Sequence, residues 1–170
     1  MFQVNDVITY GAQGVCQIAG IEQKTVGGKD KTYFVLKPVA DKASTFFVPT
    51  DNELVLKKMR RLLTKDEIHK LIDSMPEDNA VWVTNENERK EQYRNILAEG
   101  DHLELIKMIK AIYTYKKERE AEGKRLHMSD ERFFKDAEQM LYSEFRNVLD
   151  LDSKDDLMNY ILQRIEKQDT

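Results

Sequence analysis

The chain has 170 residues, of which 41% are hydrophobic and 34% charged, enough apolar material for one ordinary domain or two small ones beneath a highly charged surface. No apolar run approaches the roughly 18–20 residues that a membrane span needs, and the N-terminus lacks the basic and apolar segments of a signal peptide. These features predict a cytoplasmic protein without a membrane partner.

The net charge of −4 is distributed unevenly along the chain. The balance of basic over acidic residues is +3 for 1–62, −5 for 63–88, +3 for 89–125 and −5 for 126–170. This distribution argues against nucleic-acid binding by bulk positive charge, which would require a broadly basic chain. It leaves open a contact through a local basic face.

The N-terminal part is predicted to form short antiparallel strands. The stretch GVCQIAGIEQKTV has the β-branched content of a strand, GGKD supplies turn residues that adopt positive φ, and KTYFVLKP returns as the second arm of a hairpin. A third strand, STFFVP, follows. So few short strands bury a core only by curling into a small barrel, because a flat sheet leaves one face wet and both edges open. We therefore predict an SH3- or Tudor-like domain over residues 1–60.

From Leu62 onward the apolar residues recur with a helical period. TKDEIHKLI opens with a capping box from Thr64 to Glu67, and Gly100 and Gly123 interrupt the later helices. These signals predict a bundle of about five helices over residues 61–170, and hence an α+β chain that is all-β and then all-α. The apolar stripes expected to face its core are Leu105, Ile106, Ile109, Ile112 and Tyr113; Phe133, Phe134, Ala137, Met140, Leu141, Phe145 and Val148; and Leu157, Tyr160, Ile161 and Ile165.

Motifs for catalysis or metal binding do not occur in the sequence. His69, His102 and His127 lack the spacing of a metal site, so we expect surface or helix-cap histidines. Cys16 is the only cysteine, which excludes an internal disulfide and favours a small buried residue in a strand. No glycine-rich phosphate loop or nucleophile elbow is present. We expect that the protein is not an enzyme and that it binds no cofactor, metal or small-molecule substrate.

A local basic face is the remaining unusual feature. On a helix, Arg89, Lys90 and Arg94 lie within about a turn of one another, with Tyr93 among them and Trp82, the only tryptophan, just before. Basic side chains that hold a phosphate backbone while an aromatic ring wedges against a base step are typical of nucleic-acid binding. The alternative is a tryptophan that anchors the core and basic residues that face solvent.

The order of a barrel and then a helical bundle resembles the CarD family of bacterial transcription regulators, also called CdnL. VPTDNELVLKKMRRL resembles the family's Val-Pro segment and the arginine after it, and ILAEGD its Leu-x-x-Gly-Asp turn. Departures are Asn5 where a glycine is usual, Gly11 where a proline is common, and Phe47 where relatives are often basic. The N-terminal matches are Phe2, Asp6, Tyr10, Gly14 with Val15, and Tyr33 with Val35, Leu36 and Lys37.

The resemblance implies a non-enzymatic factor that binds RNA polymerase at promoters. The family's N-terminal module, shared with the transcription-repair coupling factor, lays a strand edge against the polymerase β subunit. Its helical domain meets DNA at the upstream edge of the melted bubble, with a tryptophan in the minor groove and basic residues on the backbone, and alters open-complex stability. Such a protein binds DNA only weakly alone and is associated with the nucleoid through polymerase. The polymerase-binding residues predicted here are Lys24, Thr45, Phe46, Phe47 and Val48, and the DNA-binding residues Trp82, Arg89, Lys90 and Arg94.

Two other functions remain open. A protein–protein interaction adaptor without DNA contact is motivated by the acidic balance of residues 63–88 and 126–170. An RNA-binding stress protein has less support, because the barrel offers no aromatic platform beyond Tyr33, Phe34, Phe46 and Phe47, which follow a strand pattern.

Overall fold

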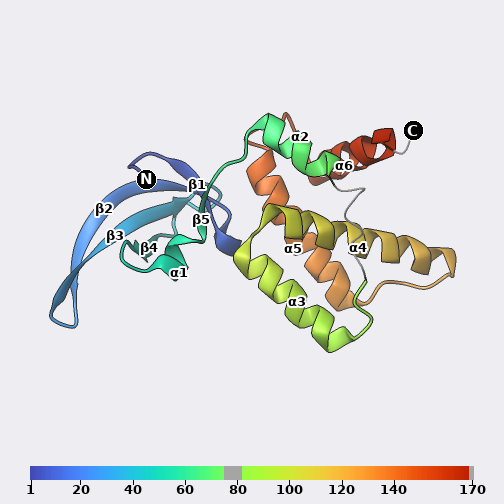
Figure 1. Ribbon diagram of the computed structural model, residues 1–170, viewed down its shortest axis with the longest axis horizontal. Helices are drawn as coiled ribbons and strands as arrows, with labels where there is room; N and C mark the ends of the chain where they lie inside the picture. Colours follow the sequence, from blue (N-terminus) through green and yellow to red (C-terminus); the bar gives the residue numbers. More distant parts are fainter. Residues whose placement is uncertain (75–81, 169–170) are drawn as a thin grey trace. The chain divides into compact units, whose positions relative to one another are not determined.

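The computed structural model describes residues 1–74 and 82–168, with side chains up to Arg164. The chain divides into two compact units, Met1–Leu62 and Leu63–Thr170. The first is an antiparallel sheet and the second a set of helices (Figure 1), so the predicted α+β class is confirmed.

The N-terminal unit is built on a five-stranded sheet with the strand order β4-β3-β2-β1-β5. Its predicted hairpin is present, and Gly27 and Gly28 both adopt positive φ, at 61° and 75°, as a two-residue type I′ turn requires. The strands are β1 (Val7–Tyr10), β2 (Val15–Val26), β3 (Lys29–Pro38), β4 (Phe46–Pro49) and β5 (Met59–Arg61), with a 3-10 turn at Gly11–Gln13 and a short helix α1 (Glu53–Leu56).

The core of this unit is a cluster of buried apolar side chains from the sheet. Cys16 is fully buried, as predicted, and burial raises the pKa of its thiol to about 11, so the thiolate that would react is scarce near neutral pH. The other buried members of the core are Ile8, Ile18, Phe34, Leu36, Val48 and Met59.

Asn5 explains one departure from the family pattern. Its φ is +76°, and its N–H donates to the carbonyl of Ile18 at 2.8 Å. The backbone here needs the left-handed region that glycine enters freely, and asparagine is the residue that tolerates this region best after glycine. The turn is therefore kept without the usual glycine.

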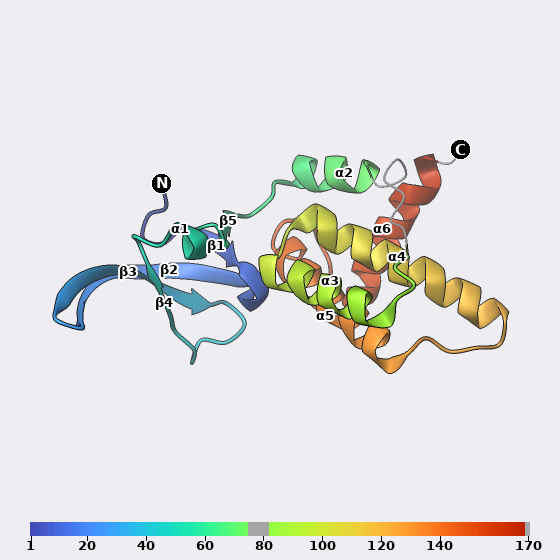
Figure 2. The same cartoon turned by 60° about the horizontal axis from the view of Figure 1, so that its bottom comes forward.

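The C-terminal unit contains five helices in its described part, as predicted. Thr64 and Glu67 form the predicted capping box, and Gly100 ends α3 in the left-handed conformation. Helix α2 packs on α6, while α3, α4 and α5 lie against one another (Figure 1 and Figure 2). The helices are α2 (Lys65–Asp73), α3 (Glu86–Glu99), α4 (His102–Ala121), α5 (Met128–Phe145) and α6 (Lys154–Gln168).

Within the helical core, Glu144 is a buried acid that organises two segments. One carboxylate oxygen accepts from the N–H of Leu63 at 3.3 Å, and the other lies against the ring nitrogen Nε2 of His102. His102 is therefore mostly buried rather than at the surface, whereas His127 is exposed and occupies the N-cap of α5. Among the described residues, no group of histidine, cysteine and acidic side chains is arranged to hold a metal ion, and no helix is long and apolar enough to span a membrane.

Candidate functional site

Strand β4 lies at an open edge of the sheet. The N–H of Thr50 donates to the carbonyl of Thr32 on β3 at 3.0 Å. Because backbone groups alternate in direction along an antiparallel strand, Val48 and Phe46 also bond toward β3, whereas the backbone of Phe47 faces away from it. The proline at position 49 has no N–H to present at that edge and ends the strand there.

The side chains of β4 alternate between the core and the outside, as its sequence predicts. Phe46 packs against the core, Val48 is 0% exposed and Phe47 is 42% exposed. Of the two phenylalanines, Phe46 is therefore the one that serves the core and Phe47 the one that is available, as the strand pattern predicts, while docking through this strand stays a prediction. Thr45 is exposed but precedes the strand, so Phe47 is the surface residue of β4.

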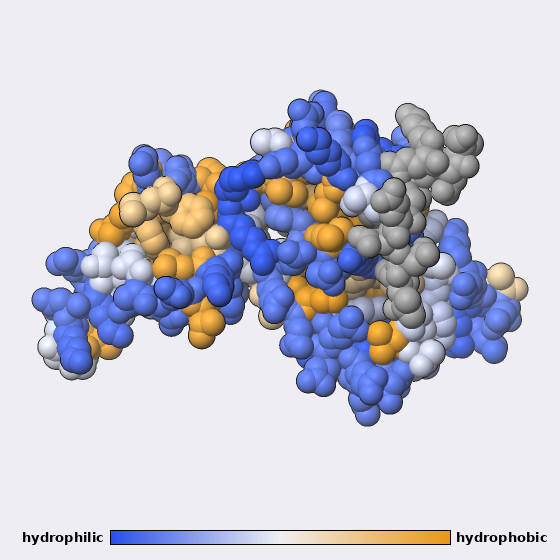
Figure 3. Space-filling view, in the orientation of Figure 1, coloured by the Kyte–Doolittle hydropathy of each residue, from blue (hydrophilic) through white to orange (hydrophobic). Residues whose placement is uncertain are grey.

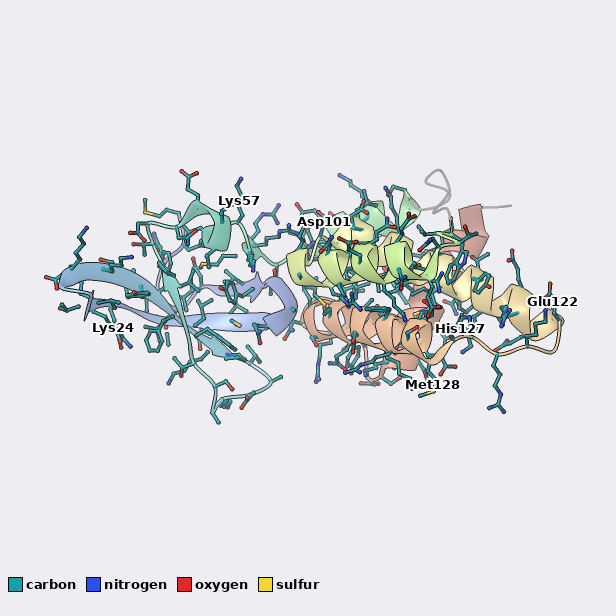
Figure 4. The ribbon with its side chains drawn as sticks, turned by 90° about the horizontal axis from the view of Figure 1, so that it is seen from below. Lys24, Lys57, Asp101, Glu122, His127 and Met128 are labelled. Atoms are coloured by element: carbon teal, nitrogen blue, oxygen red, sulfur yellow. The ribbon has the colours of Figure 1, made fainter. Side chains whose placement is uncertain are left out.

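Phe47 joins Lys24 and Tyr33 in an aromatic and basic cluster, here called the Phe47 cluster. The ammonium Nζ of Lys24 lies 3.4 Å from the centroid of the Phe47 ring, a cation–π contact. The ring of Tyr33 meets Phe47 edge to face, with centroids 6.4 Å apart. Lys24 also stands directly opposite Lys31 in the β2–β3 ladder, where two like charges repel. The cluster therefore presents an excess of positive charge over an exposed ring, and Figure 4 marks Lys24 on the β2–β3 hairpin.

The predicted contact of Lys24 with this region is consistent with the geometry, whereas Tyr33 was missed as a site residue. Its signal was available, because Tyr33 is two residues from Lys31 and shares the face of Lys24. Apolar side chains also gather on the visible face of the N-terminal unit around α1 and β4 (Figure 3), and its exposed hydrophobic residues include Val7 and Leu54.

Trp82 lies in an extended segment just before α3 and is partly buried. Its ring stacks on Tyr115 of α4, with centroids 3.9 Å apart and planes 11° apart. The guanidinium of Arg89 covers the ring at 4.4 Å, and since Tyr115 already occupies one face, this contact takes the other. The indole is therefore held on both faces and reaches solvent by its edge.

Arg89 is an internal residue and not part of a basic surface. Its side chain is 3% exposed and binds Asp130 of α5 through two hydrogen bonds of 2.9 Å. Burial acts to lower the pKa of Arg89, but the hydrogen bonds and charge of Asp130 outweigh it, so the pKa is raised and the group stays charged. The prediction that Arg89 contacts a phosphate backbone is wrong, because its donors are used inside the protein.

The other predicted basic residues of α3 are nearer to solvent. Lys90 is 29% exposed and pairs with Glu86 at 2.9 Å, and Arg94 is exposed. Tyr93, which the sequence placed among them, is buried against Phe133, and burial raises the pKa of its hydroxyl to about 12. At about 100° per residue, Lys90 and Arg94 lie on a different side of α3 from the residues that face Trp82.

A pocket of about 490 Å³ opens beside Trp82 between α3 and α4. Its apolar lining includes Ile96 and Met108, and its polar lining includes Glu88, Glu104 and Lys107. Lys107 is therefore the cation that lines the pocket together with Trp82, and it lies 3.6 Å from Glu104. The structure thus brings Trp82 together with Arg89, Tyr115 and Lys107, whereas Lys90 and Arg94 lie on another side of α3.

A comparison with known protein families assigns the sheet. Residues 2–63 match the family model of the CarD-like/TRCF RID domain, where RID denotes an RNA polymerase-interacting domain. The N-terminal unit belongs to this domain family. The RID match ends one residue beyond the boundary of the N-terminal unit at Leu62.

The RID domain supports RNA polymerase binding and a role in transcription, as the resemblance predicted. The open β4 edge and the Phe47 cluster both lie within the RID domain, whereas Trp82 and its pocket lie beyond the matched residues. The match therefore concerns the N-terminal unit. The function of the helical unit has to be inferred from its own structure.

Proposed function

We propose that the protein is a non-enzymatic transcription regulator that binds the RNA polymerase β subunit through the RID domain and modulates the stability of promoter open complexes. The observation that carries this proposal is the RID match over residues 2–63, together with an edge strand whose central residue, Phe47, is exposed. A strand edge with free backbone groups pairs readily with a strand of another chain. This edge is the docking site for the β subunit.

The helical unit then contacts promoter DNA at the upstream edge of the bubble. Support comes from Trp82, whose ring stacks on Tyr115 and which is only partly buried. A fixed aromatic edge can wedge against a base step in the minor groove, and melting at the bubble has already reduced the unstacking cost. Polymerase binding raises the local concentration of the helical unit at DNA, so weak intrinsic affinity is enough.

An interaction adaptor without DNA contact is the second candidate. Glu88 and Glu104 line the pocket beside Trp82, and two carboxylates there disfavour an approaching phosphate. In this alternative the same pocket receives a protein side chain.

The lifetime of open complexes separates the two candidates. RNA polymerase is bound to a linear promoter fragment and challenged with a competitor, with and without the full-length protein. A changed lifetime is expected if the helical unit contacts DNA. Stable co-purification with polymerase and an unchanged lifetime on every promoter tested would favour the adaptor.

The salt dependence of the DNA affinity identifies the phosphate contact. We expect Lys107→Gln to lower the slope of log affinity against log salt by about one, because each phosphate contact releases roughly one counterion. Arg94→Gln is the matched control, since it removes an exposed cation from the side of α3 that does not face Trp82. If Arg94→Gln lowers the slope and Lys107→Gln does not, the DNA contact lies at the predicted residues Lys90 and Arg94. DNA affinity is measured on the polymerase-bound protein across a series of salt concentrations.

A further inference from the structure

The ion pair between Arg89 and Asp130 is almost completely buried. Arg89 is 3% exposed and Asp130 is 0% exposed, and two parallel hydrogen bonds of 2.9 Å join them. Asp130 lies in the first turn of α5, which begins at the residue marked Met128 in Figure 4. The pair therefore connects the start of α5 to α3 through the interior.

Arg89 uses a third donor on the tryptophan segment. Its Nη1 donates to the carbonyl of Val83 at 2.9 Å, directly after Trp82 in the chain. The same guanidinium covers one face of the Trp82 ring at 4.4 Å, while Tyr115 stacks on the other. One buried side chain thus holds both the backbone next to Trp82 and the plane of its indole.

Stability alone is a poor reason for this arrangement. Moving two charges from water into an interior costs several kcal/mol per ion, and well-packed apolar residues often replace such a pair without loss of stability. An apolar pair forms no directional interactions. A planar guanidinium that is held by two hydrogen bonds can donate to a carbonyl and stack on an aromatic ring at the same time.

We propose that Asp130 is a positioning residue for Trp82, and that it acts through Arg89 to set the orientation in which the indole edge is presented. Asp130 itself touches neither DNA nor polymerase in this scheme. The consequence for open complexes rests on the proposed function, whereas the consequence for the orientation of Trp82 does not.

The single tryptophan makes the orientation measurable, since the emission of the folded protein excited at the indole band comes from Trp82. In Asp130→Asn we expect emission at longer wavelength and stronger quenching by acrylamide, because Arg89 loses the carboxylate that aims it. Asp73→Asn is the matched control: it removes another carboxylate that binds an arginine, Arg164 at 2.8 Å, in the same unit, whereas the Trp82 ring contacts Arg89 and Tyr115. Its emission should match that of the wild type, and unchanged emission in Asp130→Asn would overturn the proposal.

A second variant separates positioning from folding. Arg89→Met combined with Asp130→Leu removes both charges together, so no buried charge is left unpaired. We expect this double variant to unfold cooperatively at a temperature near that of the wild type, yet to show the shifted emission and to lose the open-complex effect to the level of Trp82→Ala. Wild-type emission and a wild-type open-complex lifetime in a stable double variant would mean that the pair is merely structural.

The two proposals fail in different ways. If Trp82→Ala leaves the open-complex lifetime unchanged while the two Asp130 variants shift the emission, the proposed DNA contact is wrong and the positioning of Trp82 by Asp130 stands. If Trp82→Ala changes the lifetime but the emission of the Asp130 variants stays at the wild-type value, the positioning proposal is wrong and the DNA contact stands.

Discussion

Replacing Phe47 with proline is expected to weaken RNA polymerase binding roughly tenfold relative to Phe47→Ala. Both variants remove the exposed ring, but only proline removes the backbone N–H that faces away from β3 and places a ring where a partner strand would pair. A backbone hydrogen bond contributes about 0.5–1.5 kcal/mol, and every 1.4 kcal/mol is a factor of ten in affinity. Titration of labelled protein against purified polymerase measures the difference.

Phe47 is the right position for this test because its neighbours serve the fold. Val48 is fully buried and its backbone bonds to β3, so proline at this position would disrupt the sheet. Polymerase binding would then weaken because the domain is misfolded and not because the contact is lost. Proline is tolerated on edge strands when its nitrogen faces outward, as Pro49 shows in this strand. The fold is checked by far-UV circular dichroism. Equal affinities for Phe47→Pro and Phe47→Ala would mean that the ring, and not strand pairing, makes the contact.

Trp82→Ala is expected to shorten the open-complex lifetime by roughly tenfold on promoters where the protein lengthens it, with polymerase binding unchanged. An aromatic wedge offsets an unstacking cost of a few kcal/mol, and a loss of about 1.4 kcal/mol corresponds to a factor of ten. The affinity for polymerase should not change, because Trp82 lies beyond the RID domain. Decay of competitor-resistant complexes gives the lifetime directly.

Trp82→Phe is the matched control for packing. A phenyl ring still stacks on Tyr115 and lies beneath Arg89, so the local structure is retained while the indole edge is lost. The expected order of lifetimes is wild type, then Trp82→Phe, then Trp82→Ala. If Trp82→Ala loses helical content and Trp82→Phe behaves as the wild type, the tryptophan is a packing anchor, and the DNA contact must be sought at Lys107 and Lys110 of α4.

The architecture was accessible from the sequence because its signals are local. Alternation in β4 predicted that Phe46 and Phe47 face opposite sides, and the capping box at Thr64 predicted where α2 begins. The glycine pair at 27 and 28 predicted the hairpin, since only positive φ at both positions closes a two-residue turn. Periods of two and 3.6 residues and turn chemistry are properties of neighbouring residues, so no knowledge of distant contacts was needed.

The candidate site was only partly accessible, because its geometry depends on residues far apart in the chain. Helical spacing correctly placed Arg89 and Lys90 within a turn, but it could not tell that Arg89 turns inward, since its partner Asp130 is 41 residues away. The same holds for Trp82, whose exposure depends on Tyr115 of another helix. Local sequence patterns were enough to predict a sheet followed by helices and a strand around Phe47, and the sequence of residues 2–63 was enough for the match to an RNA polymerase-interacting domain. The burial of Arg89 and Asp130, and the position of Lys107 in the pocket beside Trp82, follow only from tertiary packing. The reason is that burial depends on how the faces of different helices meet and not on the order of residues within one helix.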